Sequence, residues 1–267
     1  MITMITAIAL GIAMGTTLKY TGAASQGWSI FWGIIFMLAI QLAAGLFIRR
    51  EVNRVNRKIQ NEMTEMQRKL NRKMEAFQRR PGASVKAMQE ELIHDQHVAI
   101  RHSLDMLNEL NKYVWFNYLL DRQLNTMRVV MLFQLKEFDK VDKIMPKAMM
   151  ITAQAIAIKM TRMFKNNDPK LDDFFRKKSR KLKGDDAVLI FSLYAWIKIH
   201  QDDAKSALDA LNLAMTKCDH PVITANRDRI ANGKIKQFSN AQLGDAWYAL
   251  YLEEPKIKQQ RMERRFA

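Results

Sequence analysis

The clearest hydrophobic pattern in this chain is one long apolar segment near its start. Residues 28–48 read WSIFWGIIFMLAIQLAAGLFI, in which Ser29 and Gln41 are the only plainly polar side chains. A helix that crosses the hydrocarbon of a bilayer needs about 20 consecutive apolar residues. The segment therefore predicts a transmembrane helix. A buried core helix is the alternative, but core helices rarely extend so far without a charge.

A second apolar segment covers residues 1–18, which carry no charge. As a helix it would be about 27 Å long, which is just enough to cross a bilayer. We expect it to form a two-helix transmembrane hairpin over residues 1–48. A signal peptide cleaved near the sequence TGAAS is the alternative, although the segment lacks a basic start. Gly11 with Gly15, and Ala39 with Ala43, have the four-residue spacing that lets membrane helices approach closely.

Residues 49–80 change to a sparse apolar pattern in a basic segment. The apolar positions recur at intervals of 3, 4 and 4 residues, a period close to that of a straight helix. They are Val52, Val55, Ile59, Met63, Met66, Leu70, Met74 and Phe77. This stripe predicts one helix over residues 49–82 that ends at the Pro-Gly pair. We expect the stripe to pack on a second copy of the helix or on a neighbouring protein. A helix lying along its own globular domain is the alternative.

Residues 83–267 predict an α-helical domain, because apolar positions recur at helical spacing and glycine is scarce. The expected helices lie near residues 84–110, 113–136, 138–145, 146–165, 169–182, 185–200, 202–218, 221–231 and 240–253. Their connections are short, which favours antiparallel helical hairpins. The whole chain is therefore expected to be all-α.

One of these hairpins, residues 185–220, resembles a tetratricopeptide repeat. Ser192 and Ala195 are small residues on its first helix, and Ala204, Leu208 and Leu211 follow on the second. The stretches LGDAWYALYLEEP and VVMLFQLKEFDKVDKIMPKAM are similar to further repeats. The resemblance implies a solenoid that binds proteins on a concave face. The distance from Ser192 to Gly244 is 52 residues, which is not a multiple of the 34-residue repeat. A generic helical bundle remains the alternative.

Charge supports the predicted topology. Lys19 is the only charge among the first 48 residues, whereas residues 49–80 contain eleven Lys or Arg and four Glu. Cytoplasmic flanks of membrane helices collect basic residues, so we expect the chain after residue 48 to be cytoplasmic. These cations would anchor the inner face and attract anionic lipid headgroups. The five nearest the membrane are Arg49, Arg50, Arg54, Arg57 and Lys58.

A second basic cluster lies in the helical domain, and the whole chain has a net charge of +16. The cluster comprises Arg176, Lys177, Lys178, Arg180, Lys181 and Lys183. It predicts a patch for an anionic partner, with a plain solvated face as the alternative. Lipid or an acidic protein is favoured, and nucleic acid is disfavoured because no nucleic-acid motif is present.

The aromatic run YVWFNYLL, which begins at Tyr113, predicts core packing at the start of a helix. A contact with a membrane surface or a partner is the alternative.

Motifs for catalysis are missing from the sequence. It contains no phosphate-binding glycine loop, no nucleophile elbow and no zinc-protease motif. The single Cys218 permits neither an internal disulfide nor a cysteine-based zinc cluster. Glu91 and His94 have the spacing found in di-iron bundles, but no second such pair occurs. We therefore expect no enzyme activity, no cofactor and no metal. A metal enzyme built on His94 is a distant alternative.

Together these features predict a non-enzymatic scaffold of the cell inner membrane, multi-pass, with a cytoplasmic helical domain that binds protein partners. The arrangement resembles bacterial inner-membrane proteins with two N-terminal helices followed by tetratricopeptide-like repeats, such as the HemY type and the PelE subunit of a polysaccharide exporter. A membrane-tethered binder of anionic lipid or nucleic acid is the alternative.

Overall fold

The computed structural model describes residues 2–23, 25–78, 85–115 and 118–255. These residues form helices and turns, with no strand among them, so the predicted all-α class is confirmed. The chain divides into two compact units, which we call the N-terminal unit (residues 1–149) and the C-terminal unit (residues 150–267). Each unit is described by itself.

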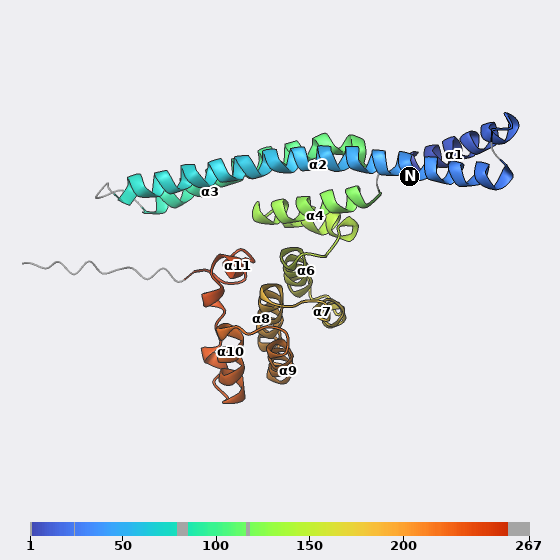
Figure 1. The fold of residues 1–267 in the computed structure, drawn as a ribbon. Coiled ribbons are helices and arrows are strands. Elements are labelled where there is room, and N and C mark those ends of the chain that lie inside the picture. The colour runs from blue at the N-terminus through green and yellow to red at the C-terminus, as the bar shows by residue number, and fades with distance from the viewer. Residues whose placement is uncertain (1, 24, 79–84, 116–117, 256–267) are drawn as a thin grey trace, which may run out of the picture. The chain divides into compact units, whose positions relative to one another are not determined.

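The N-terminal unit begins with two helices, α1 (Ile2–Tyr20) and α2 (Gln26–Gln78). α2 has 53 residues and is therefore about 80 Å long. No proline interrupts it, and the change from apolar to basic sequence after Ile48 falls inside one continuous helix (Figure 1). At the predicted boundary between residues 48 and 49, the side chains thus change from apolar to basic while the backbone stays helical.

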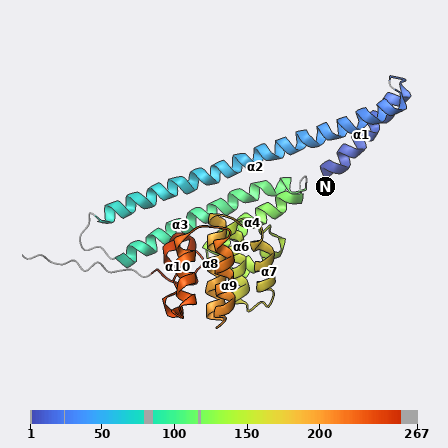
Figure 2. The ribbon, with the colours of Figure 1, turned by 60° about the horizontal axis from the view of Figure 1, so that its bottom comes forward.

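The rest of this unit comprises α3 (Val85–Asn108), the 3-10 helix η1 (Glu109–Tyr113), α4 (Tyr118–Gln134), α5 (Phe138–Ile144) and the 3-10 helix η2 (Met145–Lys147). α3 lies along the second half of α2, and α4 packs on α3 (Figures 1 and 2). The helix expected from residue 113 is corrected, because the chain first makes a 3-10 turn and α4 begins at Tyr118.

The C-terminal unit is a set of shorter helices: α6 (Ala153–Lys165), α7 (Leu171–Ser179), α8 (Asp185–His200), α9 (Ala204–Met215), α10 (Pro221–Ala231), the 3-10 helices η3 (Ile235–Gln237) and η4 (Ala241–Leu243), and α11 (Asp245–Tyr248). α8 forms the centre, because it contacts α6, α7, α9 and α10. It is buried almost all round, as expected of a helix that is apolar on every face.

Local signals explain where several of these helices begin. The Thr152 hydroxyl accepts a hydrogen bond from the Ala155 N–H at the start of α6, and the Asp203 carboxylate accepts one from the Ser206 N–H at the start of α9. α6 therefore begins later than the predicted residue 146, since Pro146 lies in the preceding 3-10 turn.

The helix predicted over residues 240–253 is wrong. Only Asp245–Tyr248 form α11, between Gly244 and Tyr251, which both have positive φ angles. A continuous helix cannot pass through residues in that conformation. The stretch that is similar to a repeat helix is therefore a short turn of helix with flanking loops.

Candidate interaction surfaces

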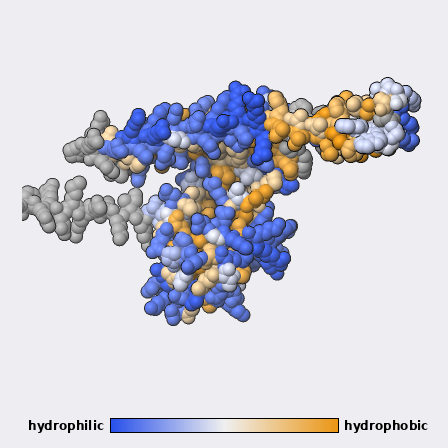
Figure 3. Space-filling model, viewed as in Figure 1, coloured by the Kyte–Doolittle hydropathy of each residue, from blue (hydrophilic) through white to orange (hydrophobic). Residues whose placement is uncertain are grey.

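The first half of α2 exposes large apolar side chains in a continuous band, which is orange in Figure 3. Almost none of this apolar half of α2 is buried, and α2 is the one helix of the described residues long and apolar enough to cross a membrane. A core helix of a soluble protein would bury such side chains. The exposed set includes Trp28, Ile30, Phe31, Trp32, Ile34, Leu38, Leu42, Leu46 and Phe47.

α1 packs on this part of α2 through glycine. A Cβ atom added to Gly33 would lie 2.7 Å from the Gly11 carbonyl oxygen, and one added to Gly11 would lie 2.8 Å from the Gly33 carbonyl oxygen. Gly15 faces the Ser29 carbonyl in the same way, at 3.1 Å. Side chains at these positions would push the two backbones apart.

The predicted role of Ala39 and Ala43 in this crossing is wrong, because both side chains are exposed. Ser29 and Gly33 take their place. These two residues have the same four-residue spacing, which was the available signal. Spacing alone does not say which of several small pairs faces α1, since that depends on the rotation of each helix about its axis.

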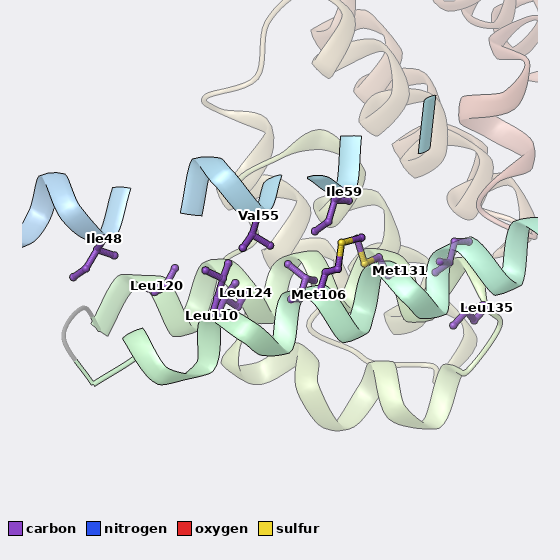
Figure 4. Close-up of a cluster of buried hydrophobic side chains, with 11 residues drawn as sticks. Ile48, Val55, Ile59, Met106, Leu110, Leu120, Leu124, Met131 and Leu135 are labelled. Carbon is purple, nitrogen blue, oxygen red and sulfur yellow. The ribbon is translucent and has the colours of Figure 1, made fainter. Parts of the chain in front are cut away.

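The apolar stripe of α2 meets the chain's own helices over its first half. Val55 and Ile59 are 3% and 6% exposed, and both point toward α3 and α4 in Figure 4. Val52 and Met63 are partly buried against the same cluster. Its buried members are Ile48, Val55, Ile59, Ile100, Met106, Leu107, Leu110, Leu120, Leu124, Met131 and Leu135. This part of the stripe follows the alternative interpretation, in which the helix packs within its own chain.

The second half of the stripe is less covered. Met66 and Leu70 are half-buried, Met74 is exposed, and the side chain of Phe77 lies outside the described part of the structure. Met66 and Leu70 line a groove of about 730 Å³ between α2 and α3, together with Val98 and Ala99. Glu62, Glu65, Lys69, Arg72, Lys73, Asp95 and His102 complete its walls. The groove is therefore apolar at its base with charges of both signs at its rim.

Polar contacts fix α3 antiparallel to α2. The Lys73 ammonium donates to the carboxylates of Glu91 and Asp95, and the distance to Glu91 Oε1 is 2.7 Å. Both bonds raise the pKa of Lys73 above its usual value. Nearer the apolar segment, His102 Nδ1 lies 2.6 Å from Glu62 Oε2.

These contacts also place the residues that we considered for metal binding. Glu91 is bonded to Lys73, and His94 is exposed to solvent. In the part of the chain that the structure describes, no three His, Cys, Asp or Glu side chains gather as a metal site requires. Glu91 and Asp95, on either side of His94, join α3 to α2 through Lys73.

The five predicted anchor charges follow the apolar band directly along α2. Arg49 and Arg50 are exposed. Arg54 lies 3.8 Å from Glu51, and Lys58 lies 3.8 Å from Glu109 at the start of η1. Surface pairs of this length are weak, so most of the positive charge stays available. Arg50, Arg54, Arg57 and Lys58 line an open groove of about 630 Å³ with Phe47, Glu51 and Asn61.

The second basic cluster lies at α7 and the turn after it. Arg176 pairs with Asp173, while Lys177, Arg180, Lys181 and Lys183 are exposed. Lys178 differs, because its ammonium is half-buried and donates to the Met150 carbonyl. Burial, followed by the charges of Lys159, Lys177 and Lys181, lowers the pKa of Lys178. Five of the six predicted cations therefore form a solvated patch, and Lys178 holds α7 to the start of α6.

Two polar clusters of the C-terminal unit, each of which joins buried donors to an exposed carboxylate, were not predicted. Lys198 is 7% exposed, and its ammonium lies 2.8 Å from the carboxylate of Asp172, which also accepts a hydrogen bond from Tyr194. Burial and the charge of Asp172 raise the pKa of the Tyr194 phenol, so it remains a proton donor. In the second cluster, the Glu253 carboxylate accepts from the indole N–H groups of Trp196 and Trp247.

Each cluster joins three side chains and holds neighbouring segments of the unit together. Burial raises the pKa of the Cys218 thiol, which disfavours the reactive thiolate form. No family model, curated protein or solved structure matches this chain. Its surfaces are therefore the basis for a functional interpretation.

Proposed function

We propose that this chain is a non-enzymatic, membrane-anchored scaffold. Its anchor is a two-helix transmembrane hairpin made of α1 and the first half of α2, in the cell inner membrane. The chain beyond Ile48 lies in the cytoplasm. One observation carries this proposal: an exposed apolar band continues without a helix break into an exposed basic segment. Basic residues collect on the cytoplasmic side of membrane helices.

The glycine crossing supports a hairpin in lipid. Helices in a bilayer have no hydrophobic driving force toward each other, because lipid tails are as apolar as their side chains. Close backbone approach, as at Gly11 and Gly33, then supplies the attraction through van der Waals contact. The outward faces of both helices are mostly apolar, and the hydroxyls of the exposed Thr16 and Thr17 donate to carbonyl groups of their own helix, as a lipid environment requires.

The cytoplasmic part binds a protein partner of a membrane complex. The binding site for this partner is the groove between α2 and α3, whose base contains Met66, Leu70 and Val98. These apolar side chains adjoin one another and are surrounded by charged residues, which is typical of an interaction surface. The hairpin of α8 and α9 has the small buried residues Ser192 and Ala195 on its first helix, which supports a tetratricopeptide-like second binding module.

A binder of anionic lipid is the second candidate, favoured by the cations around the groove at Arg50 and Arg54. The two roles are compatible, since lipid contact would orient the scaffold. Nucleic acid would use the same cations.

The test is cross-linking in membranes followed by purification in mild detergent. Met66→Asp with Val98→Asp should remove a stoichiometric protein partner, because two carboxylates would have to be buried without partners. Lys69→Gln with Arg72→Gln on the same groove should retain it, because exposed charges contribute little. Retention of the partner in the variant with both Asp substitutions would refute this binding site. Nucleic acid in place of protein would support the alternative.

A further inference from the structure

The corner between η1 and α4 lies beside the last apolar turn of α2. The Tyr113 ring meets the Phe47 ring edge-on, with 6.1 Å between centroids. Ile48 belongs to the same buried cluster as Leu110 and Leu120, on either side of the corner (Figure 4). Because α2 is one continuous helix, the contact with Phe47 places the corner level with the end of the apolar band along the α2 axis.

Two large apolar side chains of this corner point away from the core. Trp115 is 71% exposed and Leu119 is 52% exposed, whereas Leu110 and Leu120 are almost fully buried. Single exposed apolar residues are ordinary on protein surfaces. Trp115, however, follows Tyr113 by two residues, and Tyr113 contacts Phe47 of the exposed apolar band. The apolar surface of α2 is thereby extended sideways onto a second element.

Cations accompany these side chains. Lys112 is exposed, and its ammonium lies 5.0 Å from the centre of the Tyr113 ring. Arg49 and Arg50 follow Phe47 directly on α2 and are exposed. Trp and Tyr concentrate at the boundary between lipid tails and headgroups, and Lys or Arg just outside it. The corner and the adjoining turn of α2 therefore carry both kinds of residue that collect at a bilayer surface.

We propose that this corner, defined as Lys112, Tyr113, Trp115 and Leu119, inserts into the headgroup region of the leaflet from which α2 emerges. The bilayer is favoured over a protein because the corner continues the apolar band at its end. The proposal rests on the proposed membrane span of α2. It gives the N-terminal unit a second contact with the membrane. Because η1 and α4 carry the corner, this contact restricts the tilt of the unit relative to the membrane.

The consequence concerns the groove that we assign to a partner. An anchor that merely crosses the bilayer can tilt where it emerges, so a groove on its cytoplasmic half would vary in its height above the membrane. A second contact with the same leaflet restricts that tilt. The groove at Met66 and Val98 would then stay at one height above the membrane, within reach of a partner in the same membrane.

The experiment uses the full chain with Cys218→Ser, which leaves no other cysteine. Trp115→Cys and Leu119→Cys are labelled with an environment-sensitive fluorophore in separate variants. Each is reconstituted alone into vesicles of phosphatidylethanolamine and phosphatidylglycerol that contain lipids brominated near the headgroup. Ile93→Cys, at an exposed apolar position on α3, is the matched control. Leu38→Cys, in the apolar band, reports the span itself with lipids brominated deeper in the tails.

We expect the lipid to quench most of the fluorescence at positions 115 and 119, and none at position 93. No protein partner is present, so quenching can come only from lipid. If position 38 is quenched while positions 115 and 119 behave like position 93, the corner does not touch the bilayer, and the membrane span still stands. If position 38 is not quenched, both the span and this inference are refuted.

Discussion

Ile59→Asp separates the two interpretations of the apolar stripe on α2. In the structure Ile59 is 6% exposed and lies in the cluster that joins α2 to α3 and α4. If the chain itself buries this position, the substitution should release α3 within a single molecule. If another copy buries it, the damage should instead depend on association. The neighbouring Gln60 is exposed, so Gln60→Asp introduces the same carboxylate as a matched control.

The expected effect is large. Truncating a buried Ile costs about 2–5 kcal/mol through lost contacts and the cavity left behind. A buried polar group without a hydrogen-bond partner adds about 1–3 kcal/mol. The total, about 3–8 kcal/mol, is comparable with the whole stability of a typical domain, about 5–15 kcal/mol. Gln60→Asp should change stability by no more than about 0.5 kcal/mol, as surface substitutions usually do.

Hydrogen–deuterium exchange of the α3 amides, read by mass spectrometry in mild detergent, measures the release of α3. Ile59→Asp should accelerate exchange around Ile100 and Leu107, equally at low and high protein concentration. Equal protection of α3 in Ile59→Asp and Gln60→Asp would refute the reasoning. Loss of wild-type protection on simple dilution would also refute it, because a second copy would then be supplying the contacts.

Three further substitutions test other parts of the molecule. Gly33→Leu should separate α1 from α2, since its Cβ would lie 2.7 Å from an α1 carbonyl oxygen. Gly45→Leu is the control, because no atom lies within 4 Å of its Cβ and the helices should stay together. The separation is measured by the thiol reactivity of a cysteine placed at the buried Ala7 in a Cys218→Ser background. Asp203→Ala should cost about 1 kcal/mol in urea unfolding, because the start of α9 loses its cap. Hydrogen bonds to that cap lower the pKa of Asp203, so its contribution is complete above the unfolded carboxyl pKa and is lost as pH falls through the folded value. Glu253→Gln should cost about 1–3 kcal/mol in the same assay, because each carboxylate oxygen accepts from one indole N–H and the substitution replaces one of these oxygens with an NH₂ group, which cannot accept.

The all-α class and most helix positions could be predicted from the sequence. α8 and α10 have the predicted bounds, because each begins at a clear signal: Gly184 precedes α8, and Pro221 starts α10. The continuous helix over residues 49–78 followed from its period and its lack of Gly and Pro. α11 could not be predicted, because its helical composition is overridden by the turn at Gly244 and by the bonds that hold Glu253.

The sequence predicted which residues make up the candidate surfaces, but not what those residues contact. The sequence showed that the stripe of α2 must be covered, and which side chains it contains. It did not show that α3 covers Val55 and Ile59 while leaving Met66 in an open groove. The register of two helices depends on loops and on distant charge pairs such as Lys73 with Glu91. The aromatic run was expected in the core, yet Trp115 is exposed there while Tyr113 is not.

By itself, the sequence determined the apolar band, its basic continuation and the helical class, because these are properties of consecutive residues and their period. Only the tertiary structure decided which small residues meet at the α1 crossing, what the stripe packs on, and which charges are already paired. The basic cluster at α7 illustrates the difference: its six cations are alike in sequence, but the fold leaves the Lys178 ammonium half-buried against a backbone carbonyl and its neighbours exposed to solvent. Burial and pairing arise from residues brought together across the chain, which no local pattern records.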